Sequence, residues 1–133
     1  MSEDANVKTV QSMYEAFGRG DIAYILDQLA DDVVWENKAP RKIPWGGSYA
    51  GRDRVPAFFD AISSTVDTEL FTPEEFIAQG DKVVVTGRFG AKVKSTGKSF
   101  TFDWVMIWTL KDQKVTSYIQ FLDSEAALPA FSP

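Results

Sequence analysis

Large apolar side chains occupy every second position from Phe100 to Trp108, within the stretch 99–123 near the end of the chain. One row of this alternation consists of Phe100, Phe102, Trp104, Met106 and Trp108. Because successive strand residues point to opposite faces of a sheet, the pattern predicts two long strands, joined by a tight turn, with one bulky aromatic face. The other row, which includes Val105 and Ile107, is also too apolar to face water fully. We expect helices over the aromatic face, with a cavity between the two layers.

The first half of the chain carries apolar residues at helical spacing. Three helices are predicted, over residues 3–17, 21–32 and 52–63. A short strand over 33–37 is followed by a segment, 38–51, whose two Pro and three Gly indicate a loop. A loop of this length in a compact domain is often functional.

From residue 67 onward the period of the apolar positions changes to two. The predicted strands are 68–71, 74–79, 82–93, 99–110 and 115–122, followed by a short helix over 124–131. Asp123 is expected to cap that closing helix. Helices followed by an antiparallel meander predict an α+β fold, with helices on one face of a curved sheet, in a single domain spanning 1–133.

The amino-acid composition excludes several kinds of catalytic chemistry and argues against several kinds of partner. The 133 residues include no Cys and no His, which excludes disulfides, thiolate catalysis and Ser–His devices. No acidic cluster has the spacing of metal ligands, so we expect no metal and no cofactor. The net charge of −5, without a long basic run, argues against a nucleic-acid partner. The polar N-terminus is unlike a signal peptide and no apolar run approaches about 18 residues, so a cytoplasmic protein without membrane contact is expected.

Four short motifs resemble those of one superfamily: ADDVVWE at 30–36, YAGRDRV at 49–55, GDKVVVTGRF at 80–89 and FLDS at 121–124. With the order of the elements, they make the chain similar to the SnoaL-like branch of the nuclear transport factor 2-like, ketosteroid isomerase-like superfamily. The resemblance implies a cone, in which a curved mixed or antiparallel sheet of the cystatin-like kind wraps around three N-terminal helices. It also implies a pocket at the open end and homodimers through the outer sheet face. It leaves the activity open, because this fold hosts isomerases, dehydratases, cyclases and binding modules.

The catalytic positions of ketosteroid isomerase are all changed in this sequence. The resemblance places the tyrosine of the first helix at Met13, one residue before Tyr14. It places the general-base aspartate at Asn37 and the protonated aspartate of the oxyanion hole at Met106. Neither Asn nor Met can abstract a proton, so steroid isomerisation by that mechanism is not expected.

Strand parity predicts which side chains face the interior. A two-residue loop at Thr96-Gly97 would place Phe89 opposite Trp104. A three-residue turn, with a positive φ at Gln113, would place Met106 opposite Tyr118 and Trp104 opposite Gln120. The predicted ligand pocket comprises Met13, Tyr14, Phe17, Trp35, Asn37, Trp45, Phe58, Phe59, Phe89, Trp104, Met106, Tyr118 and Gln120. Trp108 is a further possible member, and Trp45 or Tyr49 is the expected lid.

Two carboxylates are candidates for acid–base chemistry. Asp103 could be a catalytic group oriented by Arg88, but parity favours an ion pair on the outer face. Glu36 could be a base near the pocket mouth, although its neighbour Trp35 points inward. No catalytic residue is therefore assigned.

Two groups of polar residues have open interpretations. Tyr118 and Gln120 could either orient the carbonyl or hydroxyl of a ligand, or satisfy each other, Asn37 or a buried water. A basic cluster around the loop could attract an anionic ligand or form a solvated rim, and comprises Lys38, Arg41, Lys42, Arg52 and Arg54.

Three functions are compatible with these features. The first is binding of a small apolar or polycyclic molecule in the aromatic pocket, with polar contacts from Tyr118, Gln120 and Asn37. The second is an enzyme of the cyclase, dehydratase or isomerase kind, with its acid–base group moved to Asp103, Glu36 or Tyr118. The third is a dimeric interaction module that uses the apolar outer face.

Overall fold

The computed structural model describes residues 2–133 as four α-helices, two short 3-10 helices and six strands. The first half contains α1 (Glu3–Gly18), α2 (Ile22–Asp27), β1 (Leu29–Lys38), β2 (Gly47–Ala50), η1 (Arg52–Arg54) and α3 (Val55–Thr65). The second half contains β3 (Val66–Gln79), β4 (Lys82–Val93), β5 (Ser99–Lys111), β6 (Lys114–Leu122), α4 (Ser124–Ala127) and η2 (Leu128–Phe131). No helix among these residues is long and apolar enough to cross a membrane.

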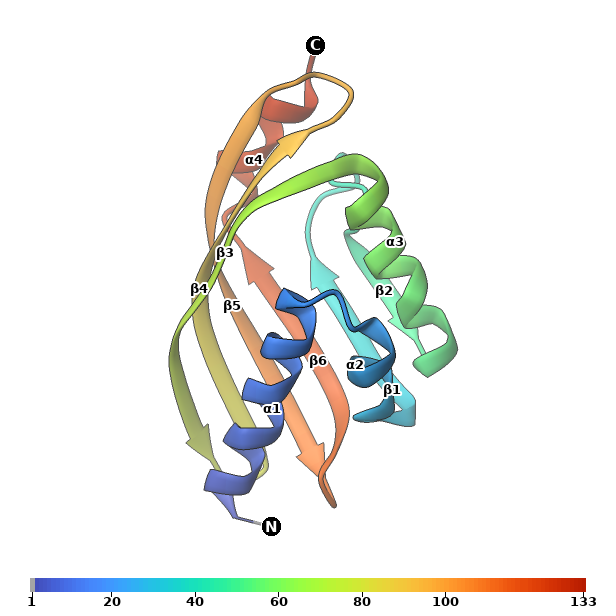
Figure 1. Cartoon of the computed structure of the whole chain (residues 1–133), viewed down its shortest axis with the longest axis vertical. Coiled ribbons are helices and arrows are strands. Elements are labelled where there is room, and N and C mark those ends of the chain that lie inside the picture. Colours follow the sequence, from blue (N-terminus) through green and yellow to red (C-terminus); the bar gives the residue numbers. More distant parts are fainter. Residues whose placement is uncertain (1) are drawn as a thin grey trace.

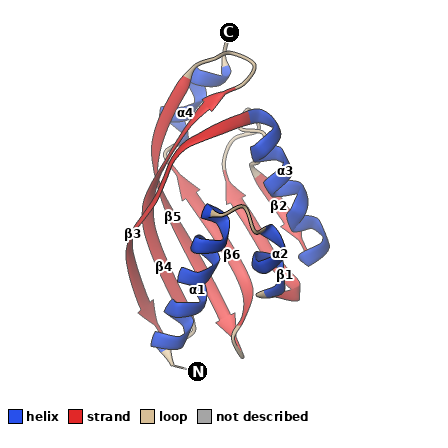
Figure 2. Ribbon diagram, viewed as in Figure 1, coloured by secondary structure: helices blue, strands red, loops and turns tan. Residues whose placement is uncertain are grey.

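The six strands form one curved, open sheet in the order β2-β1-β6-β5-β4-β3. Strands β1 and β6 run parallel and every other neighbouring pair is antiparallel. Helices α1, α2 and α3 lie on one side of the sheet, whereas α4 and η2 lie at one end of the molecule, beside the β4–β5 hairpin (Figures 1 and 2). The predicted α+β cone is therefore confirmed, including its three N-terminal helices.

Several predicted element boundaries were wrong. Helix α2 ends at Asp27, because β1 begins at Leu29 and draws Asp31 and Asp32 into the sheet. Strand β2 lies inside the predicted 38–51 loop, where pairing with β1 orders residues that show no alternation of their own.

The two strands predicted on either side of Pro73 form the single strand β3. Pro73 pairs with Gly87 beside a bulge on this edge strand. An edge position tolerates proline because its missing N–H faces away from the sheet.

Both predicted hairpin registers were wrong by two residues. The β4–β5 loop spans four residues, since the Val93 N–H donates to the Lys98 carbonyl, and Phe89 pairs with Phe102 rather than Trp104. The β5–β6 turn has only two central residues, Asp112 and Gln113. Both have positive φ, at 51° and 65°, so the predicted positive φ at Gln113 is confirmed.

A bulge after this turn sets the remaining register of β5 and β6. Met106 pairs with Gln120, Trp108 with Tyr118 and Trp104 with Leu122. Because each register is displaced by an even number of residues, every side chain keeps the face that parity predicted.

Candidate functional site

A cavity lies between the helices and the sheet, with a volume of about 60 Å³. Such a volume has room for a few water molecules, so side chains already fill most of the space between the layers. The wall consists of Met13, Tyr14, Phe17, Ile25, Trp35, Trp45, Phe58, Phe59, Ile62, Phe71, Phe89, Phe102, Met106, Trp108, Tyr118 and Gln120. All the residues predicted for the pocket lie on this wall except Asn37 and Trp104.

The two exceptions lie behind the wall. Trp104 stacks against Phe71 at 5.4 Å between ring centroids and against Tyr14 at 6.0 Å. Its indole covers Gly87, where a Cβ would lie 2.3 Å from the Trp104 Cζ2. Asn37 is 1 % exposed and reaches the cavity only through its contact with Gln120.

Sequence reasoning did not include Ile25, Ile62, Phe71 and Phe102 in the pocket. A signal for three of them was present, because Ile25 and Ile62 lie on apolar helix faces and Phe102 belongs to the aromatic row of β5. Phe71 lies on an edge strand with an irregular register, so parity alone does not place it. Trp108, which the strand pattern had suggested as a further pocket residue, does lie on the wall.

Ring contacts between β1, β5, β6 and α3 build a fully buried part of the wall. Trp35 stacks on Tyr118 with centroids 3.9 Å apart and an interplanar angle of 19°. Trp108 and Phe58 pack edge-on against Trp35, at 5.9 Å and 5.5 Å. Such offset-stacked and edge-on pairs fix the orientation of the rings, so this part of the wall is rigid.

A buried amide network joins Asn37, Tyr118 and Gln120. The Tyr118 hydroxyl donates to Gln120 Oε1 over 2.8 Å, and Asn37 Nδ2 donates to the same oxygen over 2.6 Å. These residues therefore satisfy one another in part, as one sequence interpretation proposed. The network is incomplete, because the buried Asn37 Oδ1 has no partner and Gln120 Nε2 donates to no other described residue.

A second set of polar contacts, made by Tyr14, Trp108 and Met106, lies beside the amide network on the cavity wall. The Tyr14 hydroxyl accepts a hydrogen bond from Trp108 Nε1 over 3.0 Å and donates to Met106 Sδ over 3.0 Å. A thioether sulfur is a weak acceptor, so the Tyr14 proton has a poor partner. Met106 and Gln120 are cross-strand partners, which brings the two polar groups side by side.

Both phenols stay protonated at neutral pH. Burial raises the pKa of Tyr14 far above the usual phenol value, against a smaller lowering by its bond to Trp108. Burial also raises the pKa of Tyr118, and the nearby Tyr14 adds to the effect. Within the described chain, the wall includes no Asp, Glu, Lys or Arg. The cavity therefore offers neutral hydrogen-bonding groups, and no ionised acid or base.

The candidate carboxylates lie outside the cavity. The Asp103 side chain is 82 % exposed on the convex face and pairs with Arg88 at 3.3 Å. Glu36 pairs with Lys38 at 2.7 Å on the same face. Both side chains therefore point away from the cavity, as strand parity favoured, and Asp103 forms the expected ion pair with Arg88 on the outer face.

The two residues expected to form a lid are not exposed loop residues: Trp45 is buried and Tyr49 is partly buried. Trp45 is 2 % exposed and packs edge-on against Phe89 and Phe131. The Tyr49 hydroxyl donates to the Trp45 carbonyl, which ties β2 to this corner.

Three members of the basic cluster, Lys38, Arg52 and Lys42, have partners elsewhere on the surface. Arg52 pairs with Asp31 and donates to the Leu29 carbonyl, and Lys42 donates to Ser132. None of its members contributes to the wall of the cavity.

Asp123 lies at the predicted N-cap position of the closing helix, α4, but the predicted capping hydrogen bond of its side chain is absent. Its backbone carbonyl accepts from the Ala126 N–H instead.

The chain is similar to several proteins over almost its whole length. It is 34 % identical to a nuclear transport factor 2-like protein from Burkholderia xenovorans, with a TM-score of 0.89 over 99 % of both chains. It is 29 % identical to TerC, solved with polyporic acid, with a TM-score of 0.83 over 96 % of this chain and 98 % of that one. An uncharacterised protein of Mycobacterium tuberculosis is 26 % identical over 98 % of each chain.

The family model of the SnoaL-like domain matches residues 10–118. The matched region includes α1 from Val10 onward, the strands that line the cavity and β6 as far as Tyr118. The chain therefore belongs to the SnoaL-like domain family, within the nuclear transport factor 2-like, ketosteroid isomerase-like superfamily.

Proposed function

We propose that this SnoaL-like domain binds a small, uncharged and mostly aromatic or polycyclic molecule in its cavity. The observation that carries the proposal is a wall made of aromatic and aliphatic side chains with a single buried amide, that of Gln120. Ligand pockets typically combine such a lining with a few convergent polar groups. An ionised ligand would lose its hydration without gaining a counter-charge, so neutral molecules are favoured.

The polar contact of the ligand is assigned to Gln120. Its Nε2 has no hydrogen-bond partner among residues 2–133, while its Oε1 is held by Tyr118 and Asn37. The amide is therefore oriented, with its N–H groups free to donate to a carbonyl or hydroxyl oxygen of a ligand. The Tyr14 hydroxyl, now bonded to the weak acceptor Met106 Sδ, can exchange that partner for the same oxygen.

The cavity must widen to admit a polycyclic molecule, and methionine provides the means. Met13 and Met106 both lie on the wall, and their unbranched side chains repack at low cost. The likeness to TerC, which was crystallised with polyporic acid, supports a small organic ligand in a domain of this kind.

The binding site can be tested with Nile red, a neutral polycyclic dye with a carbonyl group. Met106→Phe fills the cavity, whereas Ala23→Phe enlarges a side chain on the exposed side of α2, away from the cavity wall. We expect the wild type and Ala23→Phe to bind the dye with similar Kd values, and Met106→Phe to bind at least about tenfold more weakly because of steric overlap. Fluorescence titration measures all three.

Two results would contradict the proposal. One is the absence of dye binding to the wild type together with no copurifying molecule in native mass spectra. The other is an equal loss of affinity in both variants, because this would locate the binding site away from the cavity or indicate a general loss of structure.

A further inference from the structure

The exposure of the wall residues is uneven, and this locates the opening of the cavity. Most of the wall is buried, whereas Tyr14 and Phe17 of α1, Phe59 and Ile62 of α3, and Phe71 of β3 are only partly buried. These residues come from three elements that border one side of the cone. The opening therefore lies between α1, α3 and β3, and not at the 38–51 segment where a lid was expected.

The end of the cone beside the β4–β5 hairpin is closed by the C-terminal segment. Phe131 packs against Trp45 at 5.9 Å and against Phe100 at 5.6 Å between ring centroids. The Thr96 hydroxyl donates to the Ala130 carbonyl over 2.6 Å, and Lys98 Nζ donates to the Ser132 carbonyl over 2.8 Å. A ligand passing here would have to break all of these contacts.

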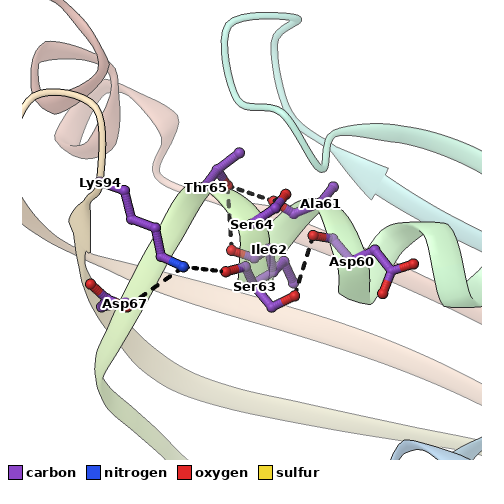
Figure 3. Close-up of polar contacts among 8 residues, drawn as sticks. All are labelled: Asp60, Ala61, Ile62, Ser63, Ser64, Thr65, Asp67 and Lys94. Carbon is purple, nitrogen blue, oxygen red and sulfur yellow. Dashed lines mark hydrogen bonds and ion pairs between the residues drawn. The ribbon is translucent and has the colours of Figure 1, made fainter.

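The α3 side of the opening is held in place where the helix meets β3. Lys94 donates to the Ser63 carbonyl over 2.8 Å and pairs with Asp67 at 3.8 Å, as Figure 3 shows. The Thr65 hydroxyl donates to the Ala61 carbonyl over 2.5 Å in the last turn of the helix. These bonds tie the end of α3 to β3 and to the β4–β5 hairpin.

Among the partly exposed aromatic residues, Phe17 has the fewest restraints, since Phe59 also packs against Trp35 and Phe58. Tyr14 is held by Trp108 and Met106, and Phe71 is stacked on Trp104. Phe17 is held by ring contacts alone, with Phe71 at 4.9 Å and Phe59 at 6.0 Å. Its ring thus spans the opening from the β3 side to the α3 side.

We propose that the Phe17 side chain is the gate of the cavity, and that its rotation about χ1 admits the neutral aromatic ligand between α1, α3 and β3. This inference rests on the proposed function for the identity of the ligand, but not for the position of the opening. Exposed side chains change rotamer in picoseconds to nanoseconds, and Phe17 is partly exposed.

The position of the gate can be tested without any ligand, because the chain has no Cys. Met106→Cys places a single thiol on the cavity wall, and its reaction rate with N-ethylmaleimide reports access to the cavity. Val83→Cys places a thiol in the core away from the wall, where reaction requires general unfolding. Each thiol is then combined with Phe17→Ala, Phe17→Trp or Phe131→Ala.

We expect Phe17→Ala to raise the reaction rate of Cys at position 106 by about tenfold or more, relative to that at position 83. The truncation opens a path to the cavity wall, whereas the thiol at position 83 still reacts only when the protein unfolds. Phe17→Trp should lower the same ratio, and Phe131→Ala should leave it within about twofold. A larger rise with Phe131→Ala than with Phe17→Ala would overturn the proposal. So would equal acceleration of both thiols by Phe17→Ala.

Stopped-flow binding of Nile red separates the gate from the proposed function. If Phe17 is the gate, Phe17→Ala raises the association rate constant of the dye by about tenfold or more. The rate constant is the deciding measurement and Kd is not, because Phe17 also lines the cavity and its truncation removes ligand contacts. Binding with unchanged rate constants would overturn the gate while the proposed function stands. No binding to the wild type would count against the proposed function, while the thiol rates still decide where the opening lies.

Discussion

Gly87 shows how one residue shapes the wall behind the cavity. The Trp104 indole occupies the space where a side chain at this position would lie, and the Thr72 carbonyl approaches from the neighbouring strand. A Cβ at this position would lie 2.3 Å from the Trp104 Cζ2 and 2.5 Å from the Thr72 oxygen. Only glycine therefore allows Trp104 to stack on Phe71 and Tyr14.

Gly87→Ala should lower the free energy of unfolding by roughly 2–3 kcal/mol, as expected when extra volume is forced into a packed core. The matched control is Gly90→Ala, three residues along the same strand, where a Cβ would have its nearest contacts at 3.2 Å. That change should cost less than about 1 kcal/mol, since small shifts relieve such contacts. Urea denaturation measures both, and equal effects would contradict this account of Gly87.

At the scale of elements, α1 is attached to the sheet through the turns at its N-terminal end. Glu3 accepts a hydrogen bond from the Gly80 N–H over 2.7 Å, in the β3–β4 turn. Thr9 donates to Gln113 Oε1 over 2.9 Å, in the β5–β6 turn. These contacts position the helix that carries Met13, Tyr14 and Phe17 to the cavity. The bond to Thr9 also explains why Gln113 occupies a left-handed position that usually favours glycine.

Two substitutions of Gln113 separate the strain of the turn from the bond to α1. Gln113→Ala loses the bond and keeps the left-handed backbone, so the free energy of unfolding should fall by about 1 kcal/mol. Gln113→Gly loses the same bond but relieves roughly 1 kcal/mol of strain, so its stability should stay close to that of the wild type. Thermal and urea unfolding test the order, and a less stable glycine variant would contradict it.

At the scale of the whole molecule, the convex face of the sheet is unusually apolar. Ile119, Ile107, Val84 and Ile77 are paired in register across β6, β5, β4 and β3. Ile77 and Phe121 are 57 % and 47 % exposed. An apolar row of this length on an open sheet is typical of a surface that another protein covers. A second copy fits best, because a two-fold axis would pair the row with itself.

We therefore expect a homodimer through this face. Light scattering should give about twice the 14.8 kDa chain mass, and Ile107→Glu should give a monomer because it buries a charge in the interface. Ala23→Glu, on the exposed side of α2, is the control and should remain dimeric. A monomeric wild type at high concentration would contradict the prediction.

The local sequence was sufficient for the class of the fold and for the face that the residues of β1, β4, β5 and β6 take. Periods of 3.6 and 2 residues follow from backbone geometry alone, so α1, β4, β5 and β6 were predicted within about two residues. Parity placed Trp35, Tyr118 and Gln120 inside and Asp103 outside. These predicted faces are correct despite both register errors, because displacement by two residues keeps every side chain on its face.

Only the tertiary structure decided the features that depend on contacts between residues distant in the chain. Strand β2 exists only through pairing with β1, and the hairpin registers depend on bulges and turn lengths that no local pattern encodes. The place of Phe71 on the cavity wall, and of Trp104 behind it, follows from the curvature of the sheet and from Gly87. The sequence by itself thus determined which residues turn inward. Only the packing of the helices against the sheet decided which of them surround the cavity and where it opens, because these depend on the relative positions of whole elements.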